Sequence, residues 1–343
     1  MTGPGTITVL VVGPAEHGVT SAALAQEAAL RSAAPGGVHL LRRQGRPAVA
    51  ELRAAVRAAP AGPLLVHITD KLFGTTPEEA ADVVVALARE RPLVVTLHDL
   101  PQPSDGPRNA ARRATAYRRM AQAAAAVMVA SCHESRLLAA CGADVAAQVV
   151  PLPVPELRSP PAADVSAPPR AVAVLGYLYP GKGHEAVVAA LSALPAGVGL
   201  VAWGRPSDAH EDLVETLGAQ ARALGRPCTV TGYVPDDELP ALLRSAVLPV
   251  APHEHLSASG SINSWIGAGR RPLVPRSDYV AELEERAPGS VWVYDDLPSA
   301  LAQAWRDPAA TWLPAGWRAG PTVADTAALV LPVLARAAAG WVP

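Results

Sequence analysis

Short, largely apolar runs recur through this chain, separated by alanine-rich stretches with helical periodicity. The runs lie at residues 7–13, 37–42, 64–68, 93–97, 126–130 and 148–152, and then at 171–176, 198–203, 228–231, 247–250, 272–274 and 291–294. A strand that is apolar at every position is buried on both faces, and helices such as 18–33 and 77–90 supply that cover. The pattern predicts an α/β fold of two doubly wound, Rossmann-like domains with parallel sheets.

A Pro-rich run, "PLPVPELRSPPAADVSAPPR" at 151–170, interrupts this pattern. Proline lacks a backbone donor and cannot sustain a helix or a central strand. We therefore place a linker at 156–170, between an N-terminal domain at 1–155 and a C-terminal domain at 171–318. Residues 319–343 are expected to form a helix that packs back on the first domain. Ligands of doubly wound sheets bind beyond the carboxyl ends of the strands, so functional motifs are expected directly after strands.

Charge and composition exclude several classes of function. The chain has 29 Lys and Arg against 31 Asp and Glu, a net charge of −2, and so lacks the basic excess of a dedicated nucleic-acid-binding protein. Cys132, Cys141 and Cys228 form no metal or disulfide pattern, which indicates a reducing, cytoplasmic location. The N-terminus lacks the pattern of a signal peptide. No apolar run approaches the roughly 18 residues needed to cross a bilayer.

The segment after the seventh run, "VLGYLYPGKGHEAVVAAL" at 174–191, nearly matches a phosphate-binding P-loop. Gly176, Gly181 and Lys182 fit the frame, but Gly183 stands where a P-loop NTPase has the Ser or Thr that binds magnesium. No convincing acidic residue follows a strand as its partner. A dehydrogenase is also disfavoured, because "GPAEHGVTSAAL" after the first strand contains no G-x-G-x-x-G. The chain is therefore expected to hold phosphate in another way.

The same segment resembles the donor-phosphate loop of retaining glycosyltransferases of the GT-B fold, glycosyltransferase family 4, in which a strand-end glycine and a short loop lead to Lys-Gly at a helix start. Other segments resemble the family in the same order along the chain: "EHGVTSAALAQE", "VVTLHDLPQP", "VMVASCHESRLL", "TGYVPDDELPALLRSAVLPVAP" and "SASGSINSWIGAGRRPLVP". The resemblance implies two domains facing a cleft. It also implies transfer of a sugar from a nucleotide diphosphate to an acceptor, with retention at the anomeric carbon.

The resemblance further implies which residues bind the donor. Lys182 would reach the diphosphate as a mobile point charge, so that neither a cofactor nor a metal ion is expected. Arg205, in "VAWGRPS", would supply a second cation, because Tyr177 stands where many members have an arginine. The predicted donor-binding residues are Gly176, Lys182, Arg205, Tyr233, Val234, Ser259, Gly260, Ser261, Asn263 and Ser264, with Tyr233 and Val234 at the base edge and residues 259–261 forming an anion loop.

The chain departs from the family at two acidic positions. Many members carry two glutamates eight residues apart, and these positions are Leu256 and Ser264 here. The second glutamate grips the ribose in the family, so that role would fall to Asn263 or Ser264. Glu254 would take the first role after a shift in loop register. Alternatively, Glu254 is a loop carboxylate without a catalytic role. Together with His253 and His255 it has the residue types of a metal site, but no further ligand stands at a suitable spacing.

In the first domain, His98 follows the fourth strand. The resemblance implies that it contacts the donor sugar through its ring or its carbonyl, which makes His98 and Glu254 the predicted catalytic residues. His17 and Gly18 would frame the cleft near the acceptor, a small molecule, a glycan or a lipid-linked group. The alternatives are that His98 is a hydrogen-bonded core histidine and that Lys182 is a solvated surface residue.

The stretch "RNAARRATAYRRM" places Arg108, Arg112 and Arg119 on one helical face, with no acidic residue between Asp105 and Glu134. Such a face is either merely solvated or contacts an anionic acceptor or a membrane surface. The second alternative predicts a cytoplasmic protein that is peripheral to the inner face of the membrane.

Two other functions stay open. A noncatalytic protein that binds nucleotide sugars would explain the missing glutamates, and a sugar-nucleotide 2-epimerase also uses paired Rossmann-like domains. The residues do not indicate which nucleotide, sugar or acceptor is used.

Overall fold

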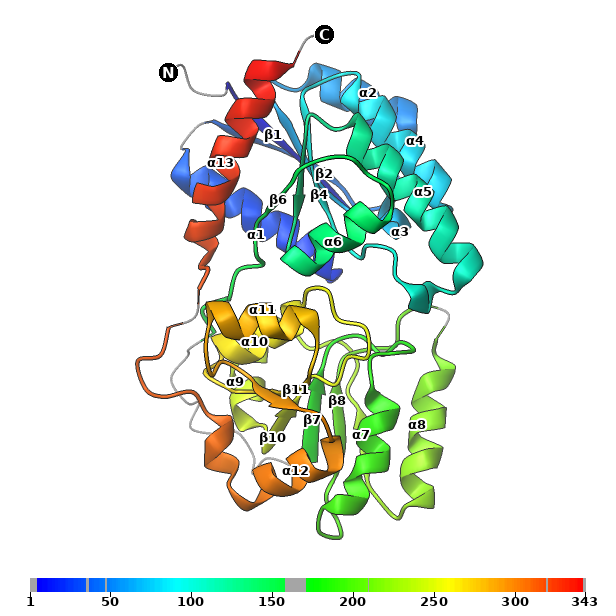
Figure 1. Cartoon of the computed structure of the whole chain (residues 1–343), viewed down its shortest axis with the longest axis vertical. Helices are drawn as coiled ribbons and strands as arrows, with labels where there is room; N and C mark the ends of the chain where they lie inside the picture. Colours follow the sequence, from blue (N-terminus) through cyan, green and yellow to red (C-terminus); the bar gives the residue numbers. More distant parts are fainter. Residues whose placement is uncertain are drawn as a thin grey trace. The chain divides into compact units, whose positions relative to one another are not determined.

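The computed structural model describes residues 5–34, 37–46, 48–157, 171–208, 210–318 and 320–341. The chain divides into two compact units, the first made of Met1–Pro153 with Pro321–Pro343 and the second of Val154–Gly320. Each unit has one six-stranded parallel sheet covered by helices on both faces (Figure 1). The prediction of two doubly wound α/β domains is confirmed. Most of the predicted linker, from residue 158 to 170, lies outside the described residues.

The first sheet has the strand order β2-β1-β3-β4-β5-β6. Its strands are β1 (Ile7–Val12), β2 (Val38–Arg43), β3 (Leu64–Ile68), β4 (Leu93–Leu97), β5 (Ala126–Val129) and β6 (Ala147–Val149). Successive side chains of β1 enter opposite cores. Leu10 and Val12 pack with residues of α2 (Val49–Ala58), α4 (Pro77–Ala88) and α5 (Pro107–Ala123). Val9 and Val11 pack with residues of α1 (Gly18–Ala33) and α13 (Val323–Gly340). Two-sided burial therefore explains the continuous apolar runs.

The second sheet has the order β12-β11-β10-β7-β8-β9. Its strands are β7 (Ala171–Leu175), β8 (Gly199–Trp203), β9 (Cys228–Val230), β10 (Leu248–Val250), β11 (Leu273–Pro275) and β12 (Trp292–Tyr294). Val172 and Val174 belong to a core with helices α7 (His184–Ala190), α8 (Asp212–Ala223) and α12 (Leu297–Arg306). Ala171 and Ala173 belong to a second core that includes Trp265 of α10 (Gly260–Gly267). All twelve strands overlap the runs that the sequence predicts.

Most of the helices lie between successive strands, and two of those near the candidate motifs, α1 and α10, have a side-chain cap at the N-terminus. The first unit contains α1 (Gly18–Ala33), α2 (Val49–Ala58), α3 (Asp70–Phe73), α4 (Pro77–Ala88), α5 (Pro107–Ala123), α6 (Cys132–Ala140) and α13 (Val323–Gly340). The second contains α7 (His184–Ala190), α8 (Asp212–Ala223), α9 (Leu239–Ser245), α10 (Gly260–Gly267), α11 (Asp278–Arg286) and α12 (Leu297–Arg306). His17 caps α1 and Ser259 caps α10, each by accepting a backbone N–H.

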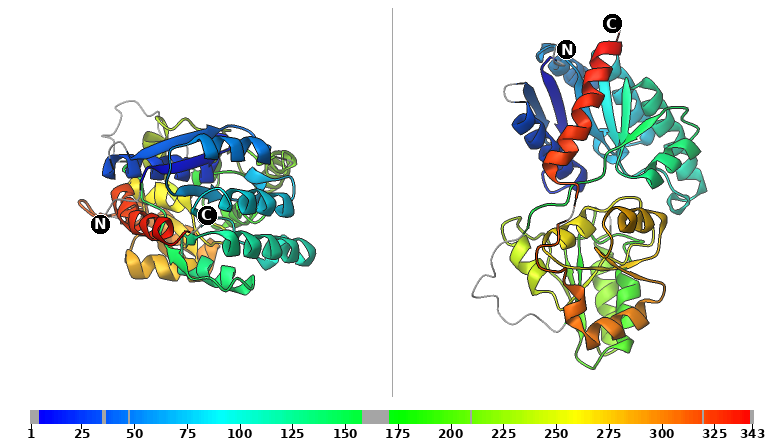
Figure 2. Two further views of the ribbon diagram at one scale, coloured as in Figure 1. Left: turned by 90° about the horizontal axis from the view of Figure 1, so that it is seen from above. Right: turned by 60° about the vertical axis from the view of Figure 1, so that its left-hand side comes forward.

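The C-terminal helix α13 is long and apolar enough to cross a membrane, with 18 residues and a mean hydropathy of 1.4, and it is the single such helix in the described ranges. The prediction that no run approaches this length was therefore wrong. However, α13 lies beside α1 (Figure 1, Figure 2), and its Ala327, Val330 and Leu334 are buried in the core shared with β1. This packing accounts for the apolar side of the helix.

Candidate functional site

The loop between β7 and α7 answers why a glycine stands at position 183. Gly176, Gly181 and Gly183 all have positive φ, at +111°, +85° and +89°. A Cβ on Gly183 would lie 2.1 Å from the carbonyl oxygen of Pro252, so no side chain fits there. Packing of this loop against the segment after β10 excludes the magnesium-binding hydroxyl of a P-loop. Gly183 therefore lets α7 begin in close contact with this segment.

Lys182 points into the second unit rather than into solvent. Its side chain is buried, with 4% of the residue exposed, and its Nζ lies 2.6 Å from Nε2 of His253 and 3.4 Å from Oγ of Ser261. A Cβ on Gly176 would approach Nζ to 3.2 Å, so the strand-end glycine makes room for the ammonium. The alternative of a solvated surface lysine is therefore wrong.

Lys182 is a buried cation for which the described residues supply no counter-ion. Burial lowers its pKa to about 7. Burial and the charge of Lys182 also lower the pKa of His184 to about 3 and the pKa of His253 well below its usual range. Within the described ranges no carboxylate forms an ion pair with Lys182. Because an unpaired buried charge is unfavourable, an anion from outside would complete this arrangement.

The loop before α10 brings a helix N-terminus to the same place. Ser259 Oγ accepts a hydrogen bond from the backbone N–H of Ile262 at 3.3 Å and lies 3.0 Å from Oγ of Ser261. Ser261 Oγ in turn lies 3.5 Å from Nε2 of His253. A Cβ on Gly260 would meet no atom within 4 Å, so space is open at the first turn of the helix. The positive end of this helix and Lys182 therefore converge through the serine hydroxyls.

These groups meet at the switch point of the second sheet. β7 and β10 are neighbours, with Val174 beside Val250, and the order of strands along the chain reverses between them. Lys182 follows β7, and His253 and the serine loop follow β10. Open α/β sheets bind ligands at the carboxyl ends of the strands at such a point.

Arg205, after β8, is held beside the lysine loop. Its guanidinium lies over the ring of Tyr177 at 5.0 Å from the centroid, and it donates to Tyr177 Oη and to Asp208, both at 3.4 Å. Its side chain is 44% exposed. This stacking places a guanidinium next to the position that carries an arginine in many family 4 members. Among the described residues, no hydrogen bond joins Arg205 to Lys182.

The predicted base and ribose residues are less tightly grouped. Tyr233 is half exposed, and its hydroxyl donates to Asp236 at 3.4 Å. Val234 is partly buried against the core near Trp265. Asn263 is 1% exposed, and the Ser264 hydroxyl donates to the carbonyl of Gly260, one turn earlier in its own helix.

Neither of the two glutamate positions of the family carries a carboxylate that reaches this site. Leu256 is buried among apolar residues of the second unit, and Ser264 is bonded to its own helix. Glu254 is exposed, and its backbone N–H donates to the carbonyl of Gly181 at 3.0 Å. No group of three or more His, Cys, Asp or Glu within the described ranges is placed to hold a metal ion.

In the first unit, the backbone of His98 is tied to its neighbours. Its N–H donates to the carbonyl of Ile68 at 2.8 Å, and its carbonyl accepts from the hydroxyl of Tyr117 at 2.8 Å. The carbonyl oxygen and the N–H of His98 are thus both hydrogen-bonded within the first unit.

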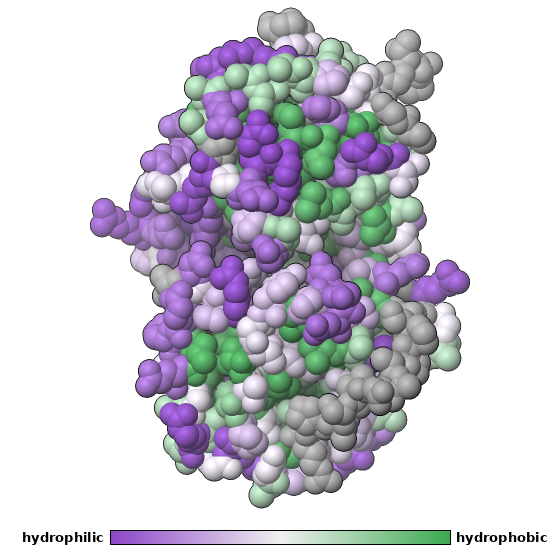
Figure 3. Space-filling model, turned by 180° about the vertical axis from the view of Figure 1, so that it is seen from behind, coloured by the Kyte–Doolittle hydropathy of each residue, from purple (hydrophilic) through white to green (hydrophobic). Residues whose placement is uncertain are grey.

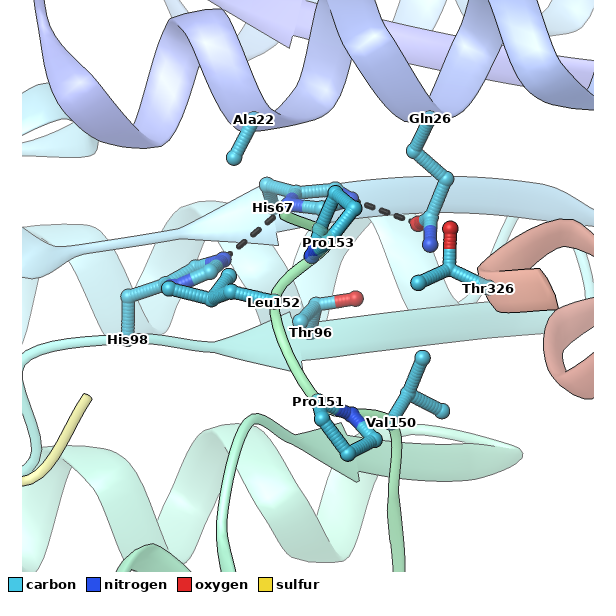
Figure 4. Close-up of a pocket in the computed structure, with 10 residues that line it drawn as sticks. All are labelled: Ala22, Gln26, His67, Thr96, His98, Val150, Pro151, Leu152, Pro153 and Thr326. Carbon is cyan, nitrogen blue, oxygen red and sulfur yellow. Dashed lines mark hydrogen bonds between the residues drawn. The ribbon is translucent and has the colours of Figure 1, made fainter. Parts of the chain in front are cut away.

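The His98 ring is part of a hydrogen-bonded series of three side chains, and the sequence alone did not identify the other two, His67 and Gln26. Nε2 of His98 lies 3.0 Å from Nδ1 of His67, and Nε2 of His67 lies 2.7 Å from Oε1 of Gln26 (Figure 4). The two rings stack with centroids 5.1 Å apart. Burial lowers the pKa of His98 to about 4 and that of His67 well below its usual range. A histidine near the end of the otherwise apolar run 64–68 was the available signal.

His17 and Gly18 stand at the start of α1. Nδ1 of His17 accepts from the backbone N–H of Val19 at 3.2 Å, which caps the helix. His17 lies close enough to His98 for its charge to lower the pKa of that ring. A Cβ on Gly18 would meet no atom within 4 Å, so the fold itself does not demand a glycine there.

A buried arginine fixes the segment that carries His98. Arg113 of α5 donates to both carboxylate oxygens of Asp70, at 3.1 and 3.2 Å, and also to Asp105 and to the carbonyl of Asp99. Asp99 has a positive φ of +49°, which is uncommon for a residue with a side chain. Arg113 therefore anchors this turn from inside the unit.

The basic face of α5 carries less net charge than the sequence alone indicates. Arg112 forms two hydrogen bonds to Glu78 of α4, at 2.8 and 2.7 Å, and Arg119 bonds Asp82 of the same helix at 2.6 Å. Arg108 is exposed. Hydrophilic and hydrophobic residues are interspersed over the face drawn in Figure 3. Contact with a membrane stays a prediction.

No protein-family model matches the chain, and no curated protein sequence matches it. Solved structures do resemble it. HepE from Anabaena, in complex with UDP and glucose, has a TM-score of 0.71 at 18% identity, over 96% of this chain and 95% of that one. Sucrose-phosphate synthase from Thermosynechococcus elongatus has a TM-score of 0.69 at 16% identity, over 97% and 96%.

A third similar structure is AviGT4, a glycosyltransferase involved in avilamycin A biosynthesis, with a TM-score of 0.62 at 16% identity over 98% of this chain and 99% of that one. Likeness at this level of identity defines the fold. With two parallel six-stranded sheets, each covered by helices, the chain has the GT-B fold of these enzymes.

Proposed function

We propose that the protein is a glycosyltransferase that moves a sugar from a nucleotide diphosphate to an acceptor. One observation carries this proposal: a buried lysine without a counter-ion among the described residues lies beside the N-terminus of α10 at the switch point of the second sheet. That combination suits the diphosphate of a nucleotide sugar. The finer proposals are family 4 membership, retention of anomeric configuration and independence from metal ions.

The chemistry follows from the charges of the reaction. Negative charge grows on the departing phosphate, and Lys182, Arg205 and the amides of residues 259–261 would stabilise it without a bound cation. Positive character grows on the sugar ring, where the neutral ring of His98 would contact a hydroxyl without adding charge. Lys182 is therefore the residue on which turnover depends most.

UDP is the proposed nucleotide. HepE has been crystallised with UDP and with UDP-glucose, and an α-glucosyltransferase of similar fold has been crystallised with UDP. A screen of UDP-, GDP- and ADP-sugars by thermal shift tests this choice, because a ligand that binds only the folded state raises the melting temperature. Stabilisation by GDP- or ADP-sugars alone would contradict it.

The test of the function is sugar transfer or donor hydrolysis with mixed small-molecule, glycan and lipid-linked acceptors, with and without EDTA. Lys182→Ala should remain folded and lose turnover, whereas near-normal turnover would overturn the assignment. Lys71 is the chain's other lysine and is exposed, so Lys71→Ala is a matched control.

A noncatalytic nucleotide-sugar-binding protein is the second candidate. It is favoured by the burial of Leu256 and the internal hydrogen bond of Ser264 at the two positions where the family carries glutamates. Stabilisation by a nucleotide sugar without transfer or hydrolysis would support it. Formation of a 2-epimer without acceptor would instead indicate an epimerase.

A further inference from the structure

The two hydrogen bonds that link Gln26, His67 and His98 run in the same direction. The Gln26 amide oxygen that faces His67 can only accept, so Nε2 of His67 carries the proton. The neutral His67 ring then has a bare Nδ1, which accepts from Nε2–H of His98. A neutral His98 is left with a bare Nδ1, and no described residue donates to that atom.

The surroundings keep both rings neutral and leave space beside them. Both histidines are 6% exposed, and neither forms an ion pair among the described residues. The charged groups that act on His98 are Asp99 and His17, with opposite effects on its pKa. A cavity of about 20 Å³, large enough for one hydroxyl-sized group, borders Gln26, both rings and the buried, unbonded hydroxyl of Thr96 (Figure 4).

We propose that His67 and Gln26 are positioning residues that fix His98 as its Nε2–H tautomer, leaving Nδ1 as the acceptor for a hydroxyl of the donor sugar. The role of Nδ1 rests on the proposed function, whereas the tautomer does not. A histidine without a fixed hydrogen-bond partner would sample both tautomers, and a protonated one would repel the positive character of the reacting sugar. The hydrogen bonds from His98 to His67 in β3 and from His67 to Gln26 in α1, together with burial of both rings, prevent both situations.

The tautomer is read directly from a long-range ¹H–¹⁵N spectrum of the histidine rings in the full chain at pH 7. His98→Gln assigns the His98 signals by their loss. We expect a neutral Nε2–H ring for both His67 and His98 in the unaltered protein. Gln26→Leu should give His98 a mixture of tautomers, and Gln26→Glu, which can only accept, should keep the single one. A dominant Nδ1–H form of His98, or spectra unchanged in Gln26→Leu, would overturn the proposal.

Kinetics then connect the tautomer to turnover. Gln26→Leu should lower kcat/KM for the donor sugar roughly tenfold, the equivalent of one hydrogen bond, and Gln26→Glu should recover most of it. The affinity for UDP alone should not change, because the groups proposed to hold the diphosphate belong to the second unit. A parallel loss of UDP affinity would indicate general damage to the protein and would reject the positioning role. If the unaltered protein transfers and hydrolyses no sugar, the proposed function fails, while the spectra still decide the tautomer.

Discussion

Burial of Lys182 predicts that donor binding takes up a proton above pH 7. Because burial lowers its pKa to about 7, only about one free molecule in eleven carries the ammonium at pH 8. A bound diphosphate favours the charged form and raises this pKa. The site therefore binds well when Lys182 is protonated and loses affinity as the pH rises through 7.

The magnitude follows from the protonated fraction. The apparent Kd equals the intrinsic Kd divided by that fraction, so relative to pH 5 it should rise about twofold at pH 7, about 11-fold at pH 8 and about 100-fold at pH 9. His253 and His184 do not produce this dependence, because their lowered pKa values keep both rings neutral throughout the range.

The assay is titration calorimetry with UDP-glucose, whose diphosphate carries no group that titrates between pH 6 and 9. At pH 8, buffers of different ionisation enthalpy should report uptake of close to one proton. Lys182→Arg keeps its charge at every pH tested, so its profile should be flat, while Lys71→Arg should behave as the unaltered protein. A flat profile in the unaltered protein, or an unchanged slope in Lys182→Arg, would refute the reasoning.

Three further predictions concern packing and surface charge. Gly183→Ser should lower the free energy of unfolding by more than about 3 kcal/mol in urea titration, against about 1 kcal/mol for Gly197→Ser, which shares the positive φ but has open space; equal losses would exclude the predicted clash. Arg113→Met should cost about 3–5 kcal/mol, because it leaves a buried carboxylate unpaired, whereas Arg112→Met at an exposed pair should change stability little; a mild effect of Arg113→Met would contradict its anchoring role. Pelleting with anionic liposomes should weaken with salt and fall in Arg108→Glu, and absent or salt-independent pelleting would reject membrane contact.

The layers of this fold can be predicted from sequence because the central strands of each sheet are buried on both faces and therefore appear as apolar runs. The Lys182 loop was also readable, since a strand-end glycine followed by Lys-Gly is a local pattern. His67 was not recognised because a single polar residue in an apolar strand does not indicate, from its neighbours in sequence, what it binds. Its role depends on Gln26, which is 41 positions away in sequence.

Long-range contacts explain the other misses. The partner of Lys182 is His253, 71 positions away, and no spacing rule connects them. Arg113 looked like its exposed neighbours in an arginine-rich stretch, although its carboxylate partner Asp70 is 43 positions distant. The charge of the α5 face was overestimated for the same reason, because α4 supplies the opposing carboxylates.

The placement of α13 bears on synthesis of the chain. Ala327, Val330 and Leu334 complete a core built largely from residues before Val150, so this core stays open while the whole second unit is translated. The first unit therefore cannot complete this core until the last helix of the chain has been made. A chain truncated before α13 would expose the apolar residues of the first sheet that this helix covers. Chaperones and proteases would recognise that exposed surface.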